Sequence, residues 1–188
     1  MKLVGPINHY RADLSGWIGS VVMFIFALFA TYRWHTTGLI FFALLVVRDL
    51  AASWFLLSRN PSASVQSSVR PWRLTDLLAY ISSALPLLYL PAESASSFAA
   101  LASTLLAIAG FTISTLALLD LGTSFGVAPA NRGIVRSGLY RYLRHPMYAG
   151  YVIAEVGFVL LNPVNAVILA ASFFFYILRA KLENRIFD

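Results

Sequence analysis

The sequence predicts an all-α fold: a polytopic bundle of membrane helices with about six membrane-embedded segments, the last two forming a helical hairpin. Hydrophobic residues make up 59% of the 188-residue chain and charged residues only 12%, whereas soluble domains carry about 25% charged residues. The apolar residues also gather in runs close to the ~20 residues that cross a bilayer. We interpret residues 1–188 as one domain, with four transmembrane helices in 1–119 and a polar loop, the hairpin and a tail in 120–188.

Four apolar runs in the first part of the chain predict the four transmembrane helices. A polar stretch with two prolines, 58–73, separates the second run from the third and is typical of a loop. Pro86 lies inside the third run, where we expect it to kink the helix, because proline donates no backbone hydrogen bond. The predicted helices are Leu14–Tyr32, Thr37–Leu57, Leu74–Leu90 and Phe98–Leu119.

Three ionisable residues lie inside apolar runs, where charged groups are costly and usually paired or functional. Arg48 and Asp49 are adjacent in the second run, and adjacent residues of a helix do not face each other. We therefore expect them to find separate partners or to reach opposite sides of the bundle, and for Asp49 we favour a pairing with an arginine of another helix. Glu155, in the later hairpin, either contacts a bound cation or hydrogen-bonds a neighbouring helix, and the sequence leaves both readings open.

The last third of the chain predicts a long polar loop and then the hairpin. The loop extends over about 120–145, and the sequence "NPVN" at Asn162–Asn165 indicates a tight turn. Each hairpin helix is at the short end for a full span, so either could be tilted, partly embedded or extended by its polar flank. The two predicted helices are about Met147–Leu161 and Pro163–Leu178.

The basic residues predict the orientation of the chain in the membrane. The net charge is +6, and basic loops alternate along the chain with loops that carry few basic residues. Cytoplasmic loops of membrane proteins carry an excess of Lys and Arg, so we expect both termini and the arginine-rich loop 120–145 to be cytoplasmic. Basic residues in short loops suit anionic lipid headgroups, and we expect membrane lipids rather than nucleic acid as partners.

The chain contains no cysteine, which excludes a disulfide frame, a thiolate nucleophile and a thiolate metal site. We expect no metal centre. The N-terminus lacks the short charged and apolar leader of a secreted protein, so we expect no removable signal peptide.

The stretch "GLYRYLRHPMYAGY", Gly138–Tyr151, is too rich in charged and aromatic side chains for a simple connection. Pro146 follows His145 directly and suits the first turn of a helix, whose free N–H groups attract anionic groups. The tyrosines suit either a stacked ring such as adenine or a belt at the membrane surface, and we favour the belt for Tyr142. Arg132 and Arg136 either bind a ligand or act only as topology signals.

The C-terminal stretch "LRAKLENRIFD" holds a second group of charged residues. Arg179 and Glu183 are four residues apart and share a face if the last helix continues beyond Leu178. They form either an exposed salt bridge of little energy or a site for a charged substrate and a cationic cofactor. The sequence alone leaves both readings open.

Both stretches resemble the isoprenylcysteine carboxyl methyltransferase and phospholipid methyltransferase superfamily. The resemblance covers roughly residues 121–188 and centres on "RHPMYAG", Arg144–Gly150, which "SGLYRY" precedes. In that family an Arg-His-Pro-x-Tyr-x-Gly signature precedes a helical hairpin, and an arginine and a Glu-Glu pair follow the hairpin. The corresponding residues here are Arg179, Glu183 and Asn184, so the second glutamate is replaced. Members of the family usually continue further than the position of Asp188.

The resemblance implies S-adenosylmethionine as cofactor. It implies that Arg179 and Glu183 are the catalytic residues, with Arg179 orienting the methyl acceptor and Glu183 also holding the charged end of the cofactor. The cofactor-binding residues that it implies are Tyr140, Arg144, His145, Pro146, Tyr148, Gly150, Glu183 and Asn184.

The function that this resemblance implies is an integral membrane methyltransferase that acts on a lipophilic or small acceptor. An in-line displacement on a sulfonium needs mainly alignment of the acceptor, which suits a chain without a thiolate nucleophile. One alternative is an NADPH-dependent membrane reductase of the sterol reductase type, which carries a similar motif in longer chains. A second alternative is a catalytically inactive membrane binding module, to which the replacement by Asn184 points.

Overall fold

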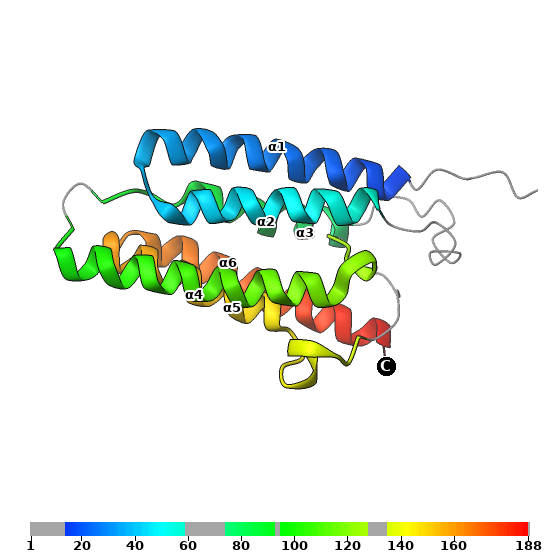
Figure 1. The fold of residues 1–188 in the computed structure, drawn as a ribbon. Coiled ribbons are helices and arrows are strands. Elements are labelled where there is room, and N and C mark those ends of the chain that lie inside the picture. Colours follow the sequence, from blue (N-terminus) through cyan, green and yellow to red (C-terminus); the bar gives the residue numbers. More distant parts are fainter. Residues whose placement is uncertain (1–13, 59–73, 93–94, 128–134, 188) are drawn as a thin grey trace, which may run out of the picture.

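The computed structural model describes residues 14–58, 74–92, 95–127 and 135–187. Within these ranges the chain forms six α-helices and three short 3₁₀ turns, and it forms no strand, which confirms the predicted all-α fold. Figure 1 shows an up-and-down bundle in which consecutive helices run in opposite directions. The helices are α1 (Leu14–Thr37), α2 (Ile40–Leu57), α3 (Leu74–Ala84), α4 (Ser97–Leu121), α5 (Pro146–Leu161) and α6 (Asn165–Phe187), and the 3₁₀ turns are η2 (Leu85–Leu88), η3 (Gly122–Ser124) and η4 (Gly138–Arg141).

The composition of the helices makes this a multi-pass membrane protein. Among the described residues, α1, α2, α4 and α6 are long and apolar enough to cross a membrane, whereas α5 and the stretch 77–88 are apolar but shorter. Large apolar side chains face outward, for example Phe98 at 80% and Val167 at 73% exposure. An apolar surface of this kind is unfavourable in water and suits a lipid environment.

The boundary between the first two helices lies further along the chain than the sequence predicts. α1 continues past Tyr32 to Thr37, and α2 begins at Ile40. Gly38 has a φ of +68°, a conformation that favours glycine, and its N–H donates to the Trp34 carbonyl at 2.8 Å. The end of the helix is therefore set by this glycine.

Pro86 ends a helix instead of kinking it. α3 stops at Ala84, and the chain continues as the tighter turn η2, which contains Pro86. A proline inside a helix removes one hydrogen bond and clashes with the preceding turn. The predicted helix Leu74–Leu90 is thus an α-helix followed by a 3₁₀ turn.

The hairpin is confirmed, with a longer second helix. α6 begins at Asn165 instead of Pro163 and continues beyond Leu178 to Phe187. The side chain of Asn165 fixes the turn before it, because its Nδ2 donates to the carbonyls of Leu90 and Phe158 at 2.9 and 3.0 Å. Because α6 continues beyond Leu178, Arg179 and Glu183 share one face of the helix, as the sequence analysis required.

The most extensive helix contact in the bundle joins α4 and α5, whose axes approach closely at two glycines. A Cβ atom on Gly150 would lie 2.5 Å from the Gly110 carbonyl oxygen and 2.8 Å from the Ser114 nitrogen. A Cβ on Gly110 would lie 2.5 Å from the Ala154 nitrogen. Small residues let membrane helices pack backbone against backbone, and these two hold α5 in its register on α4.

The expectation of separate partners for Arg48 and Asp49 is wrong. The Arg48 guanidinium donates to Asp49 Oδ1, with Nε at 2.8 Å and a second contact from Nη2, and both residues are buried. The long arginine side chain folds back onto its neighbour and also lies over the Tyr151 ring, 5.0 Å from its centre. Burying two unpaired charges would cost several kcal/mol each, on the order expected for ions in an apolar medium. The two side chains therefore pair with each other, although adjacent positions of a helix point in different directions.

Glu155 hydrogen-bonds neighbouring elements, the second of the two readings that the sequence left open. Its carboxylate accepts from the Tyr89 hydroxyl at 3.0 Å and from the Tyr176 hydroxyl of α6 at 2.6 Å. Glu155 is 1% exposed, so these bonds meet the need of a buried polar group for partners. They tie α5 to α6 and to the end of η2.

Candidate functional site

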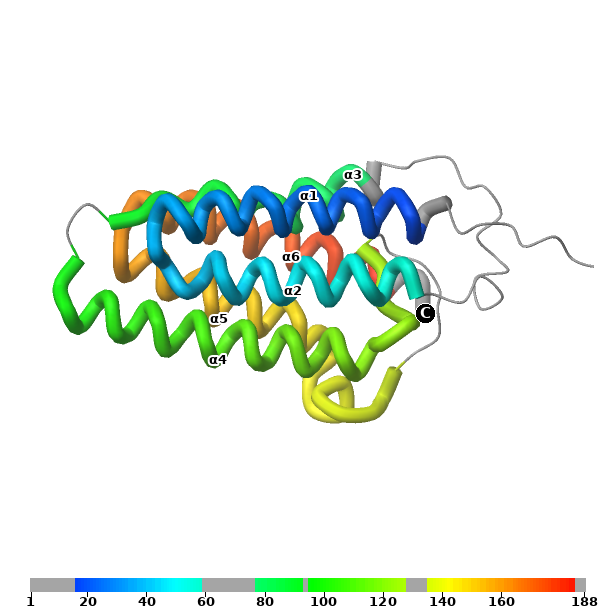
Figure 2. Tube along the Cα trace, turned by 45° about the horizontal axis from the view of Figure 1, so that its top comes forward, coloured from blue at the N-terminus to red at the C-terminus, as the bar shows by residue number. Residues whose placement is uncertain are grey.

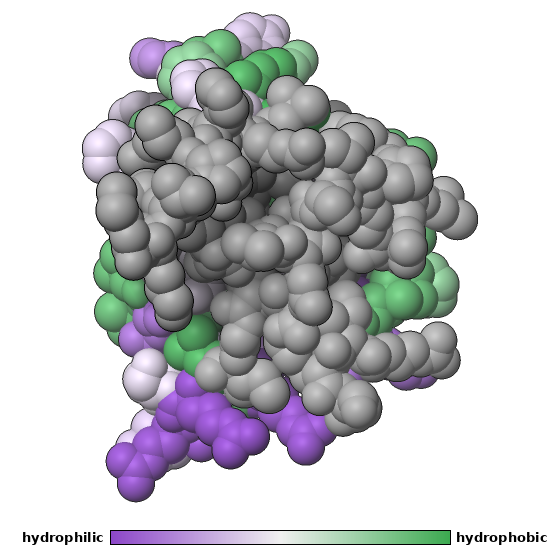
Figure 3. All heavy atoms as spheres, turned by 90° about the vertical axis from the view of Figure 1, so that its right-hand side faces the viewer, coloured by the Kyte–Doolittle hydropathy of each residue, from purple (hydrophilic) through white to green (hydrophobic). Residues whose placement is uncertain are grey.

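The polar loop and the ends of the described chain gather at one end of the bundle. Figures 1 and 2 show the start of α1, the end of α6 and the segment 135–145 at the same end. Figure 3 looks onto this end and shows hydrophilic residues along the lower edge, where that segment lies, and hydrophobic residues on the flanks. Arg136, Arg141 and Arg144 are exposed there. Arg132 lies outside the described residues.

The segment that carries the motif is attached to the end of α4 by Asp120. The Asp120 carboxylate accepts a hydrogen bond from the Leu139 backbone N–H at 2.8 Å. Gly138 precedes it with a φ of +55°, and a Cβ there would collide with the Asp120 carboxylate. Glycine is therefore required twice at this position, for the backbone conformation and for the space.

We expect Asp120→Ala to loosen this segment. Loss of one hydrogen bond of ~1 kcal/mol should raise the population of the open segment about fivefold. Limited trypsin digestion, followed by mass spectrometry of the product that ends at Arg141, measures this as a faster cleavage. Asp120→Asn keeps an oxygen acceptor and is expected to behave like the wild type. Equal cleavage rates for wild type and Asp120→Ala would show that the bond does not hold the segment.

The motif then places His145 and Pro146 at the start of α5. Pro146 is the first residue of the helix, as predicted, and is buried, and His145 is the residue before it. The His145 ring reaches the end of α6, with Nδ1 3.4 Å from Glu183 Oε2 and Nε2 3.3 Å from Asn184 Oδ1. Residues far apart in the sequence thus meet at this end of the bundle.

Tyr148 completes the contact between the two stretches. Its hydroxyl donates to Glu183 Oε1 at 2.5 Å. Its ring stacks on His145 with centres 5.6 Å apart and on Tyr176 with centres 5.5 Å apart. The result is a column of three aromatic rings that leads from the rim of the bundle into its interior, with the Glu183 carboxylate at its side.

Arg179 lies one turn deeper on α6 and is not part of an exposed salt bridge. It is 7% exposed, and its guanidinium lies over the Tyr148 ring, 5.2 Å from the ring centre. Nη1 donates to Ser82 Oγ at 2.9 Å and Nη2 to the Val127 carbonyl at 2.8 Å. Sequence reasoning missed both partners, because no local pattern relates a serine of α3 to an arginine of α6.

The remaining predicted residues divide between the site and its support. Tyr140 is half-buried and packs against the cluster that contains Tyr151 and Tyr176. Burial, together with the nearby Tyr151 and the Glu183 carboxylate, raises the pKa of Tyr140, so its hydroxyl stays protonated at neutral pH.

Gly150 and Arg144, which the resemblance assigns to the cofactor site, belong neither to the column of rings nor to the hydrogen-bonding partners of the Glu183 carboxylate in the described part of the chain. Gly150 packs against α4 instead, at the helix crossing with Gly110. The Arg144 side chain is exposed to solvent. Tyr142, which we assigned to the surface belt, is 77% exposed.

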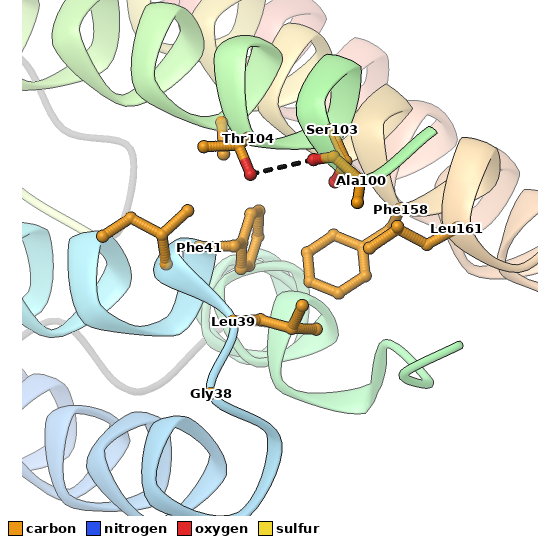
Figure 4. A pocket seen from close by; sticks show the side chains of 10 residues that line it. Gly38, Leu39, Phe41, Ala100, Ser103, Thr104, Phe158 and Leu161 are labelled. Atoms are coloured by element: carbon orange, nitrogen blue, oxygen red, sulfur yellow. Dashed lines mark hydrogen bonds between the residues drawn. The ribbon is translucent and has the colours of Figure 1, made fainter. Parts of the chain in front are cut away.

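A cavity of about 180 Å³ lies at the opposite end of the bundle (Figure 4). Leu39, Phe41, Phe158 and Leu161 line it, and Ser103 and Thr104 bring hydroxyl groups. The Thr104 hydroxyl is already used, since it donates to the Ala100 carbonyl at 2.9 Å. This cavity contains none of the predicted site residues and is separate from the cluster around Tyr148.

The site combines a carboxylate, stacked aromatic faces and a buried guanidinium. A carboxylate and aromatic faces attract a cation, and ring faces also accept a flat base. Among the described residues, no group of three or more His, Asp or Glu side chains is placed to hold a metal ion.

The fold defines the class, a multi-pass helical membrane protein, and a polar and aromatic cluster lies at one end of its bundle. Residues 101–188 match the model of the isoprenylcysteine carboxyl methyltransferase (ICMT) family. This match covers most of α4 and all of α5 and α6, and it supports an assignment to the isoprenylcysteine carboxyl methyltransferase superfamily, as the motif indicated. Searches among curated proteins and among solved structures found no match.

Proposed function

We propose that this protein is an integral membrane methyltransferase that uses S-adenosylmethionine to methylate a lipophilic or small acceptor. One observation carries the proposal: the motif residues His145 and Tyr148 contact Glu183 and Asn184 of the second stretch, with Arg179 directly behind them. The two stretches that the resemblance singles out are thus in direct contact, which supports a single site.

The chemistry of these residues suits the charged groups and the aromatic ring of this cofactor. The Glu183 carboxylate suits a cationic group such as an ammonium, and the ring faces of His145 and Tyr148 suit a sulfonium or an adenine. Asn184 is neutral where the family carries a second glutamate, and it hydrogen-bonds His145. Bound S-adenosylmethionine would supply an electrophilic methyl group on a sulfonium.

The chain's own residues would act by holding and aligning. Glu183 and Tyr148 would hold the cofactor at the rim, and Arg179 would orient the acceptor from its buried position. Alignment of the reacting groups can lower the activation barrier by roughly 7–11 kcal/mol in favourable cases, and it requires no nucleophile from the protein. The apolar surroundings of Tyr148 and Tyr176 would keep water away.

We further propose that this end of the bundle faces the cytoplasm. The arginines of 135–145 and the described chain ends lie together there, in line with the positive-inside tendency. A polar cofactor would then enter from the cytosol, and a lipophilic acceptor from the bilayer.

The chain has no native cysteine, so single cysteines can report this orientation. Arg141→Cys places a thiol on the exposed part of η4, and Val164→Cys places one in the turn between α5 and α6, where Val164 is 61% exposed. In intact cells we expect an impermeant maleimide to label only Val164→Cys, and in inverted vesicles only Arg141→Cys. The reverse pattern would place the site outside the cytoplasm.

Three measurements test the function. Calorimetry of detergent-purified protein is expected to show binding of S-adenosylmethionine and of its demethylated product, and no heat from either in a folded sample would defeat the cofactor assignment. Incubation with methyl-labelled cofactor and total membrane extract should label an acceptor. Binding without labelling would favour an inactive binding module, and tryptophan quenching by NADPH alone would favour a reductase.

A further inference from the structure

Arg179 is held in place by two groups that come from other parts of the chain. Ser82 belongs to α3, which lies outside the family match, and Val127 follows η3. Both are buried, at 0% and 4% exposure. The guanidinium reaches them with its two terminal nitrogens, Nη1 to Ser82 Oγ at 2.9 Å and Nη2 to the Val127 carbonyl at 2.8 Å.

The hydrogen-bonding pattern fixes the orientation of the Ser82 hydroxyl. Its single hydrogen is donated to the Ala79 carbonyl at 2.8 Å, which leaves the oxygen lone pairs to accept from Arg179. A hydroxyl has one donor and two acceptor lone pairs, so these two bonds are compatible. Arg179 is thereby bound to an oxygen that α3 itself holds in place.

The two hydrogen-bond partners of Arg179 do not neutralise its charge, and the Glu183 carboxylate, one turn along α6, attracts the guanidinium without a hydrogen bond to it. Ser82 and the Val127 carbonyl are neutral, in contrast to Asp49, which neutralises Arg48. The Nε atom of Arg179 is also buried and has no hydrogen-bond partner in the described part of the chain. A guanidinium that is fixed through both terminal nitrogens, with its Nε–H unused, is oriented to donate to an oxygen of a ligand.

We propose that Ser82 is a positioning residue: it holds the Arg179 guanidinium at the angle from which Arg179 orients the methyl acceptor. This inference rests on the proposed function. It assigns to α3 a part in the reaction, exerted through Arg179, that neither the motif nor the family match contains. At metal sites, residues that orient a ligand side chain contribute about 10- to 100-fold to affinity or activity, and we expect a loss of similar size in turnover when Arg179 loses Ser82.

Ser82→Ala and Ser83→Ala form a matched pair. Ser83 is the next residue, and its hydroxyl donates to the same Ala79 carbonyl at 3.0 Å, but no contact joins it to Arg179. Both variants lose a serine bond to α3, and Ser82→Ala alone loses the bond to Arg179. Ser82→Cys keeps the shape and replaces the oxygen by a weak acceptor, so it repeats the test in a variant less disturbed in packing.

The experiment measures the initial rate of methyl transfer to membrane extract at saturating cofactor, and the affinity for the demethylated cofactor by calorimetry. We expect Ser82→Ala and Ser82→Cys to lose about 10- to 100-fold in rate, with cofactor affinity within about threefold of wild type, and Ser83→Ala to keep its rate within about twofold. Rates that fall equally in the Ser82 and Ser83 variants, or a rate loss that only follows lost cofactor affinity, would overturn the positioning role. A folded wild type that labels no acceptor would overturn the proposed function, and the positioning role with it.

Discussion

Gly110→Leu is expected to prevent α4 and α5 from packing, with a loss of about 3 kcal/mol or more in the free energy of unfolding. Any Cβ at this position meets backbone atoms of α5, among them the Ala154 nitrogen at 2.5 Å. Backbone atoms inside a helix cannot move aside as a flexible side chain can. The helices must separate along their largest contact, and thermal unfolding in detergent should show a strongly lowered midpoint or no folded protein.

Ala109→Leu is the matched control for this change. Ala109 is the preceding residue of α4, but unlike the buried Gly110 it is exposed. The same added volume at that position meets lipid or detergent and should leave the midpoint nearly unchanged. If both variants unfold alike, close packing at Gly110 is not what holds the two helices together.

Glu183→Gln is expected to weaken the binding of S-adenosylmethionine by about 10- to 100-fold, or ~1.4–2.7 kcal/mol. The substitution keeps the size of the side chain and an oxygen that can accept from the Tyr148 hydroxyl, but it removes the negative charge. Hydrogen bonds to charged groups contribute about 1.5–3 kcal/mol, more than hydrogen bonds between neutral groups. Removing the charge of Glu183 should therefore lower the affinity for a cationic ligand. Calorimetric titration of the purified variant measures the affinity.

Lys181→Gln serves as the control, because it also changes one charge on α6 at an exposed position two residues away. It is expected to bind the cofactor like the wild type. Unchanged affinity in Glu183→Gln, with Lys181→Gln as reference, would mean that Glu183 does not meet the cationic part of the cofactor. Its contacts with Tyr148 and His145 would then be structural only.

Local patterns predicted the helices well, since each depends on signals within a short stretch. The apolar runs marked six helices, and Pro146 marked the start of α5 where the structure has it. Boundaries were wrong where a single residue decides them, as with Gly38, whose positive φ ends α1 later than the composition suggests. Pro86 ended a helix that hydropathy would have continued.

Side-chain partners were predicted less well, because they depend on what the neighbouring helix offers. The rule that adjacent helical residues do not pair failed for Arg48 and Asp49, where burial leaves the arginine no better partner than the next residue. Ser82 had no signal in the sequence at all, since a serine in an apolar run is common and its bond to Arg179 joins distant helices.

Hydropathy and residue type act locally, so the amino-acid sequence was enough to predict a helical membrane bundle and two stretches rich in charged and aromatic residues. The contact of His145 and Tyr148 with Glu183 becomes visible only in the folded chain. Distances between side chains of different helices follow from how the helices cross, and the contact of Gly110 with Gly150 sets that crossing for α5. The packing of α4 and α5 helps turn two separate motifs into one site.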